Sequence, residues 1–241
     1  MTMGFFDSEL GRLEQKVRRQ LESYVQEINQ SGGTYHRLDL GNGLVICGDY
    51  DMTKYVQHYN LPADLRGKTV LDVGTSSGYF ALECARRGAR VMGIDIWDST
   101  PVVRIAELLN LEIRYVVKSV YDLDPSIGPF DLVISGSLML HLPDVVGIIR
   151  KIRSVCSGMT VISTACTQDS ETNLRPLLEF VGQKAAEADY WTYWSFSAEA
   201  LKKMLLVCGF SHIESVAHFT LTSEPGRQPF ATPHVVISAS V

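Results

Sequence analysis

A short apolar segment that ends in an acidic residue and turns through two glycines constrains the fold of this chain more than any other feature. Residues 70–80 read Val-Leu-Asp-Val-Gly-Thr-Ser-Ser-Gly-Tyr-Phe, so a buried strand is followed by Gly74, Gly78 and the start of a helix. Glycines in such a turn let the backbone approach a ligand closely, and the first turn of a helix offers unpaired N–H groups. The segment therefore predicts a ligand-binding strand–turn–helix unit.

Strands and helices alternate along the chain from Lys68 onward. Apolar runs indicate strands over residues 69–73, 90–94, 113–117, 130–135 and 160–164. Helical patterns cover 79–87, 101–110, 145–155 and 197–207, and two last strands cover 212–221 and 233–241. Strands that are connected through helices form parallel sheets covered on both faces. We therefore expect an α/β fold in which a seven-stranded, mostly parallel sheet ends in an antiparallel C-terminal strand pair.

Residues 1–67 precede this alternation and form an N-terminal leader. An amphipathic helix is expected over 7–30, a short hairpin over 35–50 and another helix over 51–59. We expect this leader to be a lid or a substrate wall over a ligand-binding domain that spans 68–241. Within that domain we expect an insertion near the substrate, with a polar helix and then an aromatic cluster, over residues 167–196.

The charge balance disfavours an enzyme that acts on nucleic acid. The chain has 22 Lys and Arg against 27 Asp and Glu, a formal net charge of −5, whereas nucleic-acid enzymes usually present a basic surface. Its five cysteines are scattered, which favours a reducing compartment. No stretch resembles a signal peptide or approaches the roughly 20 apolar residues of a membrane span. We expect a cytoplasmic protein, and the pattern leaves its oligomeric state open.

Asp95 follows the next strand, 21 residues beyond Gly74. A carboxylate in this position accepts hydrogen bonds from the hydroxyls of an adenosine ribose. Two classes of cofactor share this geometry. A dinucleotide site needs Gly-x-Gly-x-x-Gly, and the loop here has different glycine spacing. In addition, Asp72 would direct a carboxylate toward the pyrophosphate, whereas an acid is favourable beside the amino group of a methionine moiety. The residues therefore favour S-adenosylmethionine over a nicotinamide dinucleotide.

The motifs resemble, in their order, those of the class I S-adenosylmethionine-dependent methyltransferases over residues 68–241. The first motif matches 72–78, with Ser76 in place of the usual middle glycine, and the ribose-binding acid matches Asp95. The adenine-flanking motif matches 119–122, and the fourth-strand motif matches 130–135. The resemblance implies a Rossmann-like fold and S-adenosylmethionine as the cofactor. The expected cofactor-binding residues are Asp72, Gly74, Thr75, Gly78, Asp95, Ile96, Ser119, Val120 and Ser135.

A narrower resemblance, carried by 35–40, 48–51, 137–144 and 194–210, is to the branch related to the tRNA wobble-uridine carboxymethyltransferases. That branch also contains many small-molecule methyltransferases. The tRNA enzymes hold a carboxylate partly with a Tyr before the His of the fourth-strand loop and have an Arg after it, whereas this chain has Leu140 and Leu142. With the acidic charge, these departures favour methyl transfer to a small molecule, in secondary metabolism. The alternatives are a tRNA-modifying (carboxy)methyltransferase, a nicotinamide-dependent oxidoreductase and a protein that binds S-adenosylmethionine without methylation.

His141 is the candidate catalytic base, because it lies in the loop after the fourth strand and a histidine titrates near neutral pH. The alternative is a structural role at the start of the following helix. Four aromatic residues are candidates for binding the substrate, with packing in the core as the alternative: Tyr35, Tyr50, Trp191 and Trp194. The remaining histidines lack ligand spacing, so no metal site is expected.

Overall fold

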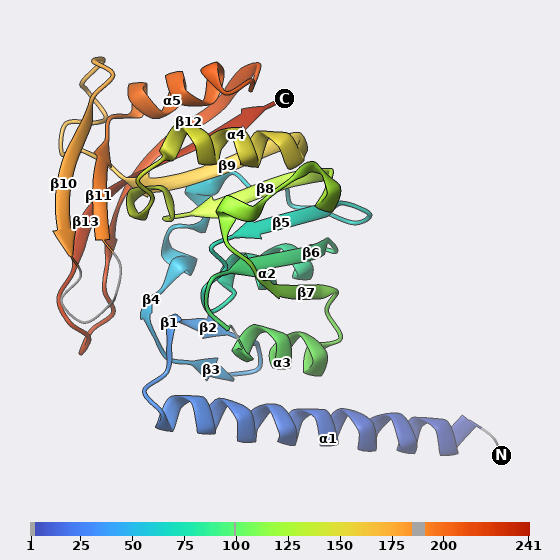
Figure 1. The fold of residues 1–241 in the computed structure, drawn as a ribbon. Helices are drawn as coiled ribbons and strands as arrows, with labels where there is room; N and C mark the ends of the chain where they lie inside the picture. Colours follow the sequence, from blue (N-terminus) through green and yellow to red (C-terminus); the bar gives the residue numbers. More distant parts are fainter. Residues whose placement is uncertain (1–2, 99, 185–190) are drawn as a thin grey trace.

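A seven-stranded sheet forms the centre of the computed structural model, which describes residues 3–98, 100–184 and 191–241 (Figure 1). The strand order is β12-β13-β9-β8-β5-β6-β7, and β13 runs antiparallel to both of its neighbours. Five strands are parallel to one another: β5 (Thr69–Val73), β6 (Arg90–Asp95), β7 (Ile113–Val117), β8 (Phe130–Gly136) and β9 (Cys156–Ala165). The last two strands are β12 (His212–Thr222) and β13 (Ala231–Ser240). The predicted α/β architecture is confirmed.

Helices cover both faces of this sheet (Figure 1). One face packs on α4 (Val145–Val155) and α5 (Ala198–Val207), and the other packs on α2 (Tyr79–Arg86) and α3 (Thr100–Leu109). Side chains of a strand alternate between its faces, so Leu71 of β5 joins the first buried cluster while its neighbour Val70 joins the second. Burial on both faces explains the near-continuous apolar runs in the sequence.

The leader packs on the α2 and α3 side of the sheet. Its helix α1 (Met3–Gln30) begins earlier than the expected residue 7, and Leu21 and Val25 are buried in the cluster that contains Val70. The expected hairpin is present as β2 (Leu38–Asp39) and β3 (Val45–Ile46). A second pair, β1 (Thr34–His36) and β4 (Gly48–Tyr50), is parallel and was not anticipated.

The single helix expected over 51–59 is wrong, because two 3₁₀ turns occupy this segment. The turn η1 (Met52–Lys54) begins where the Asp51 side chain accepts a hydrogen bond from the Thr53 N–H. The turn η2 (Val56–Tyr59) ends at Asn60, which has a left-handed φ of 48°. Local side-chain capping and the left-handed residue therefore close each turn before an α-helix can extend.

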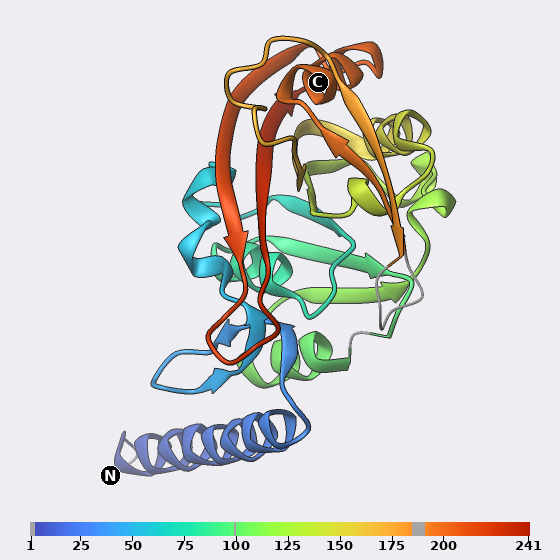
Figure 2. The same ribbon diagram turned by 90° about the vertical axis from the view of Figure 1, so that its left-hand side faces the viewer.

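The polar helix expected over 167–189 is also wrong for the described residues, and residues 185–189 lie outside them. The chain forms an antiparallel ribbon, β10 (Leu178–Lys184) with β11 (Trp191–Phe196), which forms a sheet separate from the central one (Figures 1 and 2). The aromatic run of β11 has high strand propensity and pairs across to β10, where Phe180 lies opposite Trp194. Cross-strand pairing therefore overrides the helical pattern of β10.

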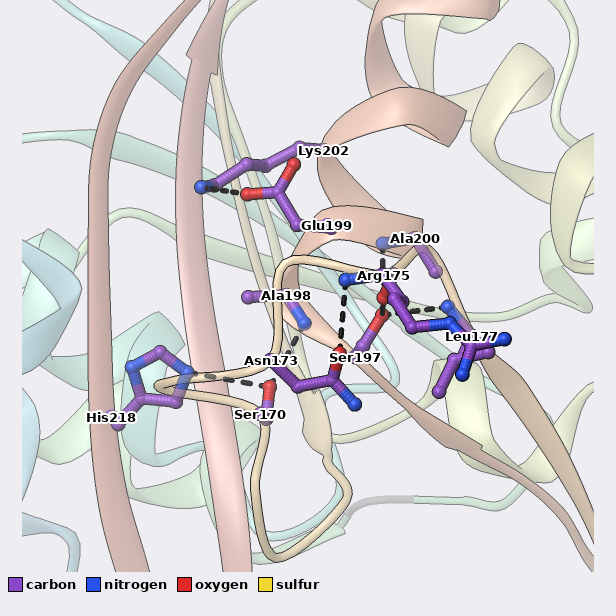
Figure 3. A network of polar contacts seen from close by, with 10 residues as sticks. All are labelled: Ser170, Asn173, Arg175, Leu177, Ser197, Ala198, Glu199, Ala200, Lys202 and His218. Carbon is purple, nitrogen blue, oxygen red and sulfur yellow. Dashed lines mark hydrogen bonds and ion pairs between the residues drawn. The ribbon is translucent and has the colours of Figure 1, made fainter.

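A polar network fixes the segment that leads into this ribbon (Figure 3). Ser170 Oγ accepts a hydrogen bond from the Ala198 N–H at 2.8 Å, at the start of α5. Ser197 Oγ accepts from the Leu177 N–H and donates to the Arg175 carbonyl, both at 2.8 Å. The ribbon is therefore anchored to the first turn of α5.

Within the described residues, no helix is both long enough and apolar enough to span a bilayer.

Candidate active site

A cavity with a volume of about 600 Å³ opens at the carboxyl ends of β5, β6, β7 and β8. This is the edge at which open α/β sheets bind their ligands. One part of the cavity is lined by residues that follow β5, β6 and β7, and we call it the motif half: Gly74, Ser76, Asp95, Ile96 and Ser119. The other part is lined by residues from distant segments, and we call it the composite half: Tyr35, His36, Ser137, His141 and His234.

Asp95 connects the first loop of the motif half to the second. Its Oδ2 accepts a hydrogen bond from the Ser76 N–H at 2.8 Å, and its Oδ1 accepts from the Ile96 N–H at 2.7 Å. A carboxylate has about four acceptor positions. Oδ1 also accepts a long hydrogen bond from the Trp97 N–H at 3.4 Å, so Oδ2 has an open position and Oδ1 has one that only this long contact occupies. Gly74 and Ser76 have φ angles of 76° and 49°, which turn the loop back toward Asp95. This donor and acceptor set fits the two hydroxyls of an adenosine ribose.

The end of β7 continues the motif half. Ser119 Oγ accepts a hydrogen bond from the Tyr121 N–H and caps the 3₁₀ turn η3 (Val120–Asp122). Ser119 and Val120 both line the cavity, as does Ile96, which is 59% exposed. A polar cap between apolar side chains fits a flat heterocycle such as adenine.

Four of the predicted cofactor-binding residues lie behind the cavity wall: Asp72, Thr75, Gly78 and Ser135. Asp72 is 2% exposed, and its Oδ2 has no hydrogen-bond partner. Burial raises the pKa of Asp72 to about 7, a hydrogen bond from the Ala81 N–H opposes this, and the charge of Asp95 adds to it. Asp72 lies inside the layer between β5 and α2, where burial favours its protonated form.

Gly78 allows two helices to pack closely. It has a φ of 93°, and a Cβ at this position would lie 2.3 Å from Cγ2 of Val102 in α3. We expected Gly78 to permit close approach of the cofactor, but the structure shows close approach of α3. Thr75 is similarly internal: its hydroxyl donates to the Asp72 carbonyl at 2.9 Å.

The leader forms one wall of the composite half. The rings of Tyr35 and Tyr50 lie 4.8 Å apart, and both residues line the cavity as expected for a substrate wall. The His36 N–H donates to Ser77 Oγ at 2.8 Å, which joins the leader to the first loop. Burial lowers the pKa of the His36 imidazole to about 4. The sequence analysis missed His36, although its neighbour Tyr35 was included.

His141 ends the 3₁₀ turn η5 (Met139–His141) and lines the cavity. Its Nδ1 lies 2.9 Å from the carbonyl oxygen of Trp191 in β11. Because a carbonyl only accepts, this contact assigns the proton to Nδ1 and leaves Nε2 as the basic nitrogen. Burial lowers the pKa of His141, and the hydrogen bond to Trp191 partly opposes the shift. The imidazole is therefore neutral at pH 7.

Neither Trp191 nor Trp194 lines the cavity, in contrast to the substrate role expected for both. Trp191 contributes its backbone carbonyl to His141, and its side chain is 43% exposed. Trp194 donates from Nε1 to the Leu142 carbonyl at 3.0 Å. Both residues therefore support the loop after β8 from behind, and they position His141.

A pair that the sequence analysis missed completes the composite half. Ser137 Oγ lies 2.8 Å from Nε2 of His234, and Nδ1 of His234 lies 2.9 Å from the Thr232 carbonyl oxygen. The two residues are 97 positions apart, so no local motif could reveal the pair.

Among the residues that the structure describes, no three His, Cys, Asp or Glu side chains gather as metal ligands.

Comparisons with known proteins identify a consistent group of relatives. Residues 49–215 match the family model described as a methyltransferase domain. The chain is 40% identical over 109 residues to the ubiquinone biosynthesis O-methyltransferase of Neisseria meningitidis serogroup C (strain 053442), a match that covers 42% of this chain and 46% of that enzyme. The chain thus spans about half the length of the curated relatives it matches.

Solved structures share the fold at low sequence identity. The N-terminal domain of EvdMO1 with bound SAH has a TM-score of 0.64 at 17% identity, over 93% of this chain and 97% of that one. The 1,6-didemethyltoxoflavin-N1-methyltransferase of Burkholderia thailandensis, solved with bound 1,6-didemethyltoxoflavin and S-adenosylhomocysteine, has a TM-score of 0.55 at 18% identity, over 85% of this chain and 98% of that one. These likenesses show the fold.

Proposed function

Because the chain belongs to the class I S-adenosylmethionine-dependent methyltransferases, we propose that it transfers a methyl group from this cofactor to a small molecule. The main support is a continuous cavity that joins the motif half, which contains Asp95, to the composite half, which contains aromatic rings and histidines. Methyl transfer is an in-line displacement, so donor and acceptor must be aligned in one enclosed space.

In this proposal the motif half binds the cofactor. Asp95 accepts the ribose hydroxyls through the open position of Oδ2, which the Ser76 N–H leaves, and through the position of Oδ1 that only the long Trp97 contact occupies. Ile96, Ser119 and Val120 flank the adenine. When bound, the cofactor supplies an electrophilic methyl group on a sulfonium centre. Gly74, at the turn after β5, lies beside the methionine portion and next to Leu138 of the composite half.

The composite half binds the acceptor. Tyr35 and Tyr50 hold it from the leader side, and His141 is the catalytic base. The hydrogen bond to the Trp191 carbonyl orients the His141 ring and keeps Nε2 unprotonated. Nε2 would take the proton of an acceptor hydroxyl and so leave a nucleophilic oxygen. That oxygen would accept the methyl group that the cofactor supplies, the methyl–sulfur bond would break and S-adenosylhomocysteine would leave. A base in this role typically contributes about 10²–10⁴-fold to the rate.

Binding of S-adenosylhomocysteine tests the cofactor assignment. Calorimetry is expected to show saturable binding of this product and none of NADH, because the glycine spacing of the first loop disfavours a pyrophosphate. Binding of NADH alone would favour an oxidoreductase. Binding of S-adenosylhomocysteine without its formation from S-adenosylmethionine, across a panel of hydroxylated small molecules, would favour a non-methylating protein.

The base assignment is tested with His141→Asn against a matched control, His212→Asn, whose side chain does not line the cavity. His141→Asn is expected to lower kcat about 10²–10⁴-fold, with unchanged affinity for S-adenosylhomocysteine, while the control retains wild-type rates. Equal losses of thermal stability and rate would instead assign His141 a structural role.

A small molecule is preferred over tRNA as the acceptor. The net charge is −5, and Leu140 and Leu142 stand where the tRNA carboxymethyltransferases have polar residues. The narrower relation to that branch is itself a proposal. Titration of bulk tRNA at several salt concentrations tests it, because genuine phosphate contacts weaken steeply with salt. Tight, salt-sensitive binding would favour the tRNA alternative.

We also propose that the protein acts in the cytoplasm and in secondary metabolism. All five cysteines are free thiols, which suits a reducing compartment, and cell fractionation checks this location. The metabolic role rests on the resemblance to small-molecule methyltransferases alone. Deletion of the gene, followed by comparison of methylated metabolites, tests that role.

A further inference from the structure

Ser137 and His234 form a hydrogen-bonded pair whose protons can be assigned. Nδ1 of His234 faces the Thr232 carbonyl oxygen at 2.9 Å, and a carbonyl only accepts, so Nδ1 carries a hydrogen. His234 is 3% exposed, and burial lowers its pKa to about 4, so the ring is neutral at pH 7. Nε2 then has a lone pair, and the Ser137 hydroxyl donates to it at 2.8 Å.

This assignment determines what Ser137 presents to the cavity. Its single hydrogen is committed to His234, so Oγ retains only acceptor capacity for a ligand. A ligand group placed against Oγ must therefore be a donor, such as a hydroxyl. A methyl or ether group in the same place would leave the lone pairs of Oγ without a donor, which is unfavourable where a ligand excludes water.

The backbone places Ser137 where the two halves of the cavity meet. Ser137 directly follows β8 and has a φ of 65°, a conformation that few residues other than glycine adopt. Its N–H donates to the Ser163 carbonyl in β9 at 2.9 Å. The next residue, Leu138, lies 3.3 Å from the position of a Cβ on Gly74 in the first loop. A ligand hydroxyl held by Ser137 is thus adjacent to the motif half.

The surroundings of the pair are aromatic. The His234 ring stacks on Phe219 at 5.4 Å with an interplanar angle of 18°. Tyr59 and Phe80, whose rings lie 4.5 Å apart, line the same cavity. Flat apolar walls around one polar group suit a flat molecule that carries a hydroxyl.

We propose that Ser137 and His234 determine acceptor specificity: Ser137 Oγ accepts a hydrogen bond from an aromatic hydroxyl, and His234 keeps Ser137 in the acceptor state. The inference rests on the proposed function, because it concerns the acceptor of the methyl group. It does not depend on which residue takes the proton. His234 acts through Ser137 and is therefore a positioning residue.

Binding of two small probes to the full-length protein tests this inference without turnover. Phenol and toluene have nearly the same shape and differ in the hydroxyl. Each is titrated into protein labelled with ¹⁵N-histidine, with saturating S-adenosylhomocysteine and without it, and the imidazole resonances are followed by NMR. The free protein is expected to show His234 as the Nδ1–H tautomer.

The Ser137→Ala variant is expected to weaken phenol binding about tenfold and to change toluene binding less than twofold, as for the loss of one hydrogen bond. Ser154→Ala is the matched control, because the Ser154 hydroxyl bonds to the Lys151 carbonyl on α4 and does not line the cavity. His234→Phe frees the Ser137 hydroxyl to donate as well as to accept, so anisole, whose ether oxygen only accepts, is expected to bind more tightly to this variant than to the wild type. The tautomer of His234 checks that Ser137→Ala remains folded.

Three results would overturn the proposal: equal weakening of both probes in Ser137→Ala, an Nε2–H tautomer of His234, or no response of a cavity histidine to phenol. The failure of the proposed function is separable from these results. In that case S-adenosylhomocysteine does not bind, whatever the preference between phenol and toluene.

Discussion

The motif half and the composite half of the cavity differ in how far apart their residues lie in the chain. The motif half uses the carboxyl ends of three strands that are adjacent in the sheet and close in sequence, from Gly74 to Ser119. The composite half combines the leader, the loop after β8 and β13, from Tyr35 to His234. One half therefore depends on local turns, and the other depends on how distant segments dock.

This difference separates two kinds of sensitivity. Changes in the motif half should affect either the cofactor or the packing of α2, since its residues divide between the cavity wall and the layer behind it. Changes in the composite half should affect the acceptor and leave the cofactor in place. The predictions that follow test this division, and they run from the largest expected effect to the smallest.

Gly78→Ala should lower the free energy of unfolding by about 2–5 kcal/mol, combining a strained positive φ with overpacking against Val102. Gly67→Ala is the matched control, because Gly67 has a φ of 72° but no atom near its Cβ position. It should lose only about 1–2 kcal/mol. Denaturant unfolding measures both variants. In the double variant with Val102→Ala, part of the loss should be recovered. If the Gly78→Ala variant has normal stability but fails to bind S-adenosylhomocysteine, Gly78 contacts the cofactor and its packing role is wrong.

Asp72 should make stability fall as pH rises. Its pKa is raised from 3.8 to about 7 in the folded state, so the folded protein holds this proton more tightly than the unfolded chain. The penalty is absent below pH 4, grows between pH 4 and pH 7, and is complete above pH 7. Its size is on the order of 2–4 kcal/mol.

Asp72→Asn removes this titration. Its free energy of unfolding, relative to wild type, should therefore increase from pH 4.5 to pH 8, as measured by denaturant titrations across that range. Asp64→Asn is the contrasting variant, because hydrogen bonds from Arg66 lower the pKa of Asp64 to about 2. An identical pH dependence of wild type and Asp72→Asn would contradict the assignment.

Asp95→Ala should weaken binding of S-adenosylhomocysteine by about 1.5–3 kcal/mol, the range for hydrogen bonds to a charged group. This corresponds to roughly tenfold to over a hundredfold in Kd. Calorimetry measures the change, and Asp64→Ala is the control because this exposed carboxylate lies outside the cofactor motifs and does not line the cavity. Phenol binding in the composite half should persist. If the folded Asp95→Ala variant binds S-adenosylhomocysteine with unchanged affinity, the carboxylate of Asp95 does not bind the ribose hydroxyls.

Trp194→Phe should have the smallest effect. It removes the hydrogen bond from Nε1 to the Leu142 carbonyl, with an expected loss of about 0.5–1.5 kcal/mol of stability. The rate should decrease modestly, since the loop that carries His141 loses one support, and affinity for S-adenosylhomocysteine should not change. Thermal unfolding and calorimetry measure these outcomes. A tenfold loss of affinity would place the Trp194 ring against the ligand.

The sequence by itself determined the sheet, the order of its elements and the wall of the motif half. The inner parallel strands β5 and β8 are buried on both faces, so their apolar runs are visible locally. Asp95 and Ser119 follow directly from strand ends, because the carboxyl ends of parallel strands lie at one edge of the sheet. The leader hairpin was also predictable, since the glycines of its turn are local.

Only the tertiary structure decided which motif residues line the cavity and which distant segments form its opposite wall. Gly78 lies against Val102 and Asp72 faces α2, because helix packing fixes the direction of a side chain that spacing leaves open. The ribbon of β10 and β11 replaced a predicted helix through pairing across residues that sequence periodicity cannot connect. Ser137 contacts His234 although the two residues are 97 positions apart, because the pairing of β13 with β9 brings these distant segments together. The local sequence around either residue does not indicate this contact.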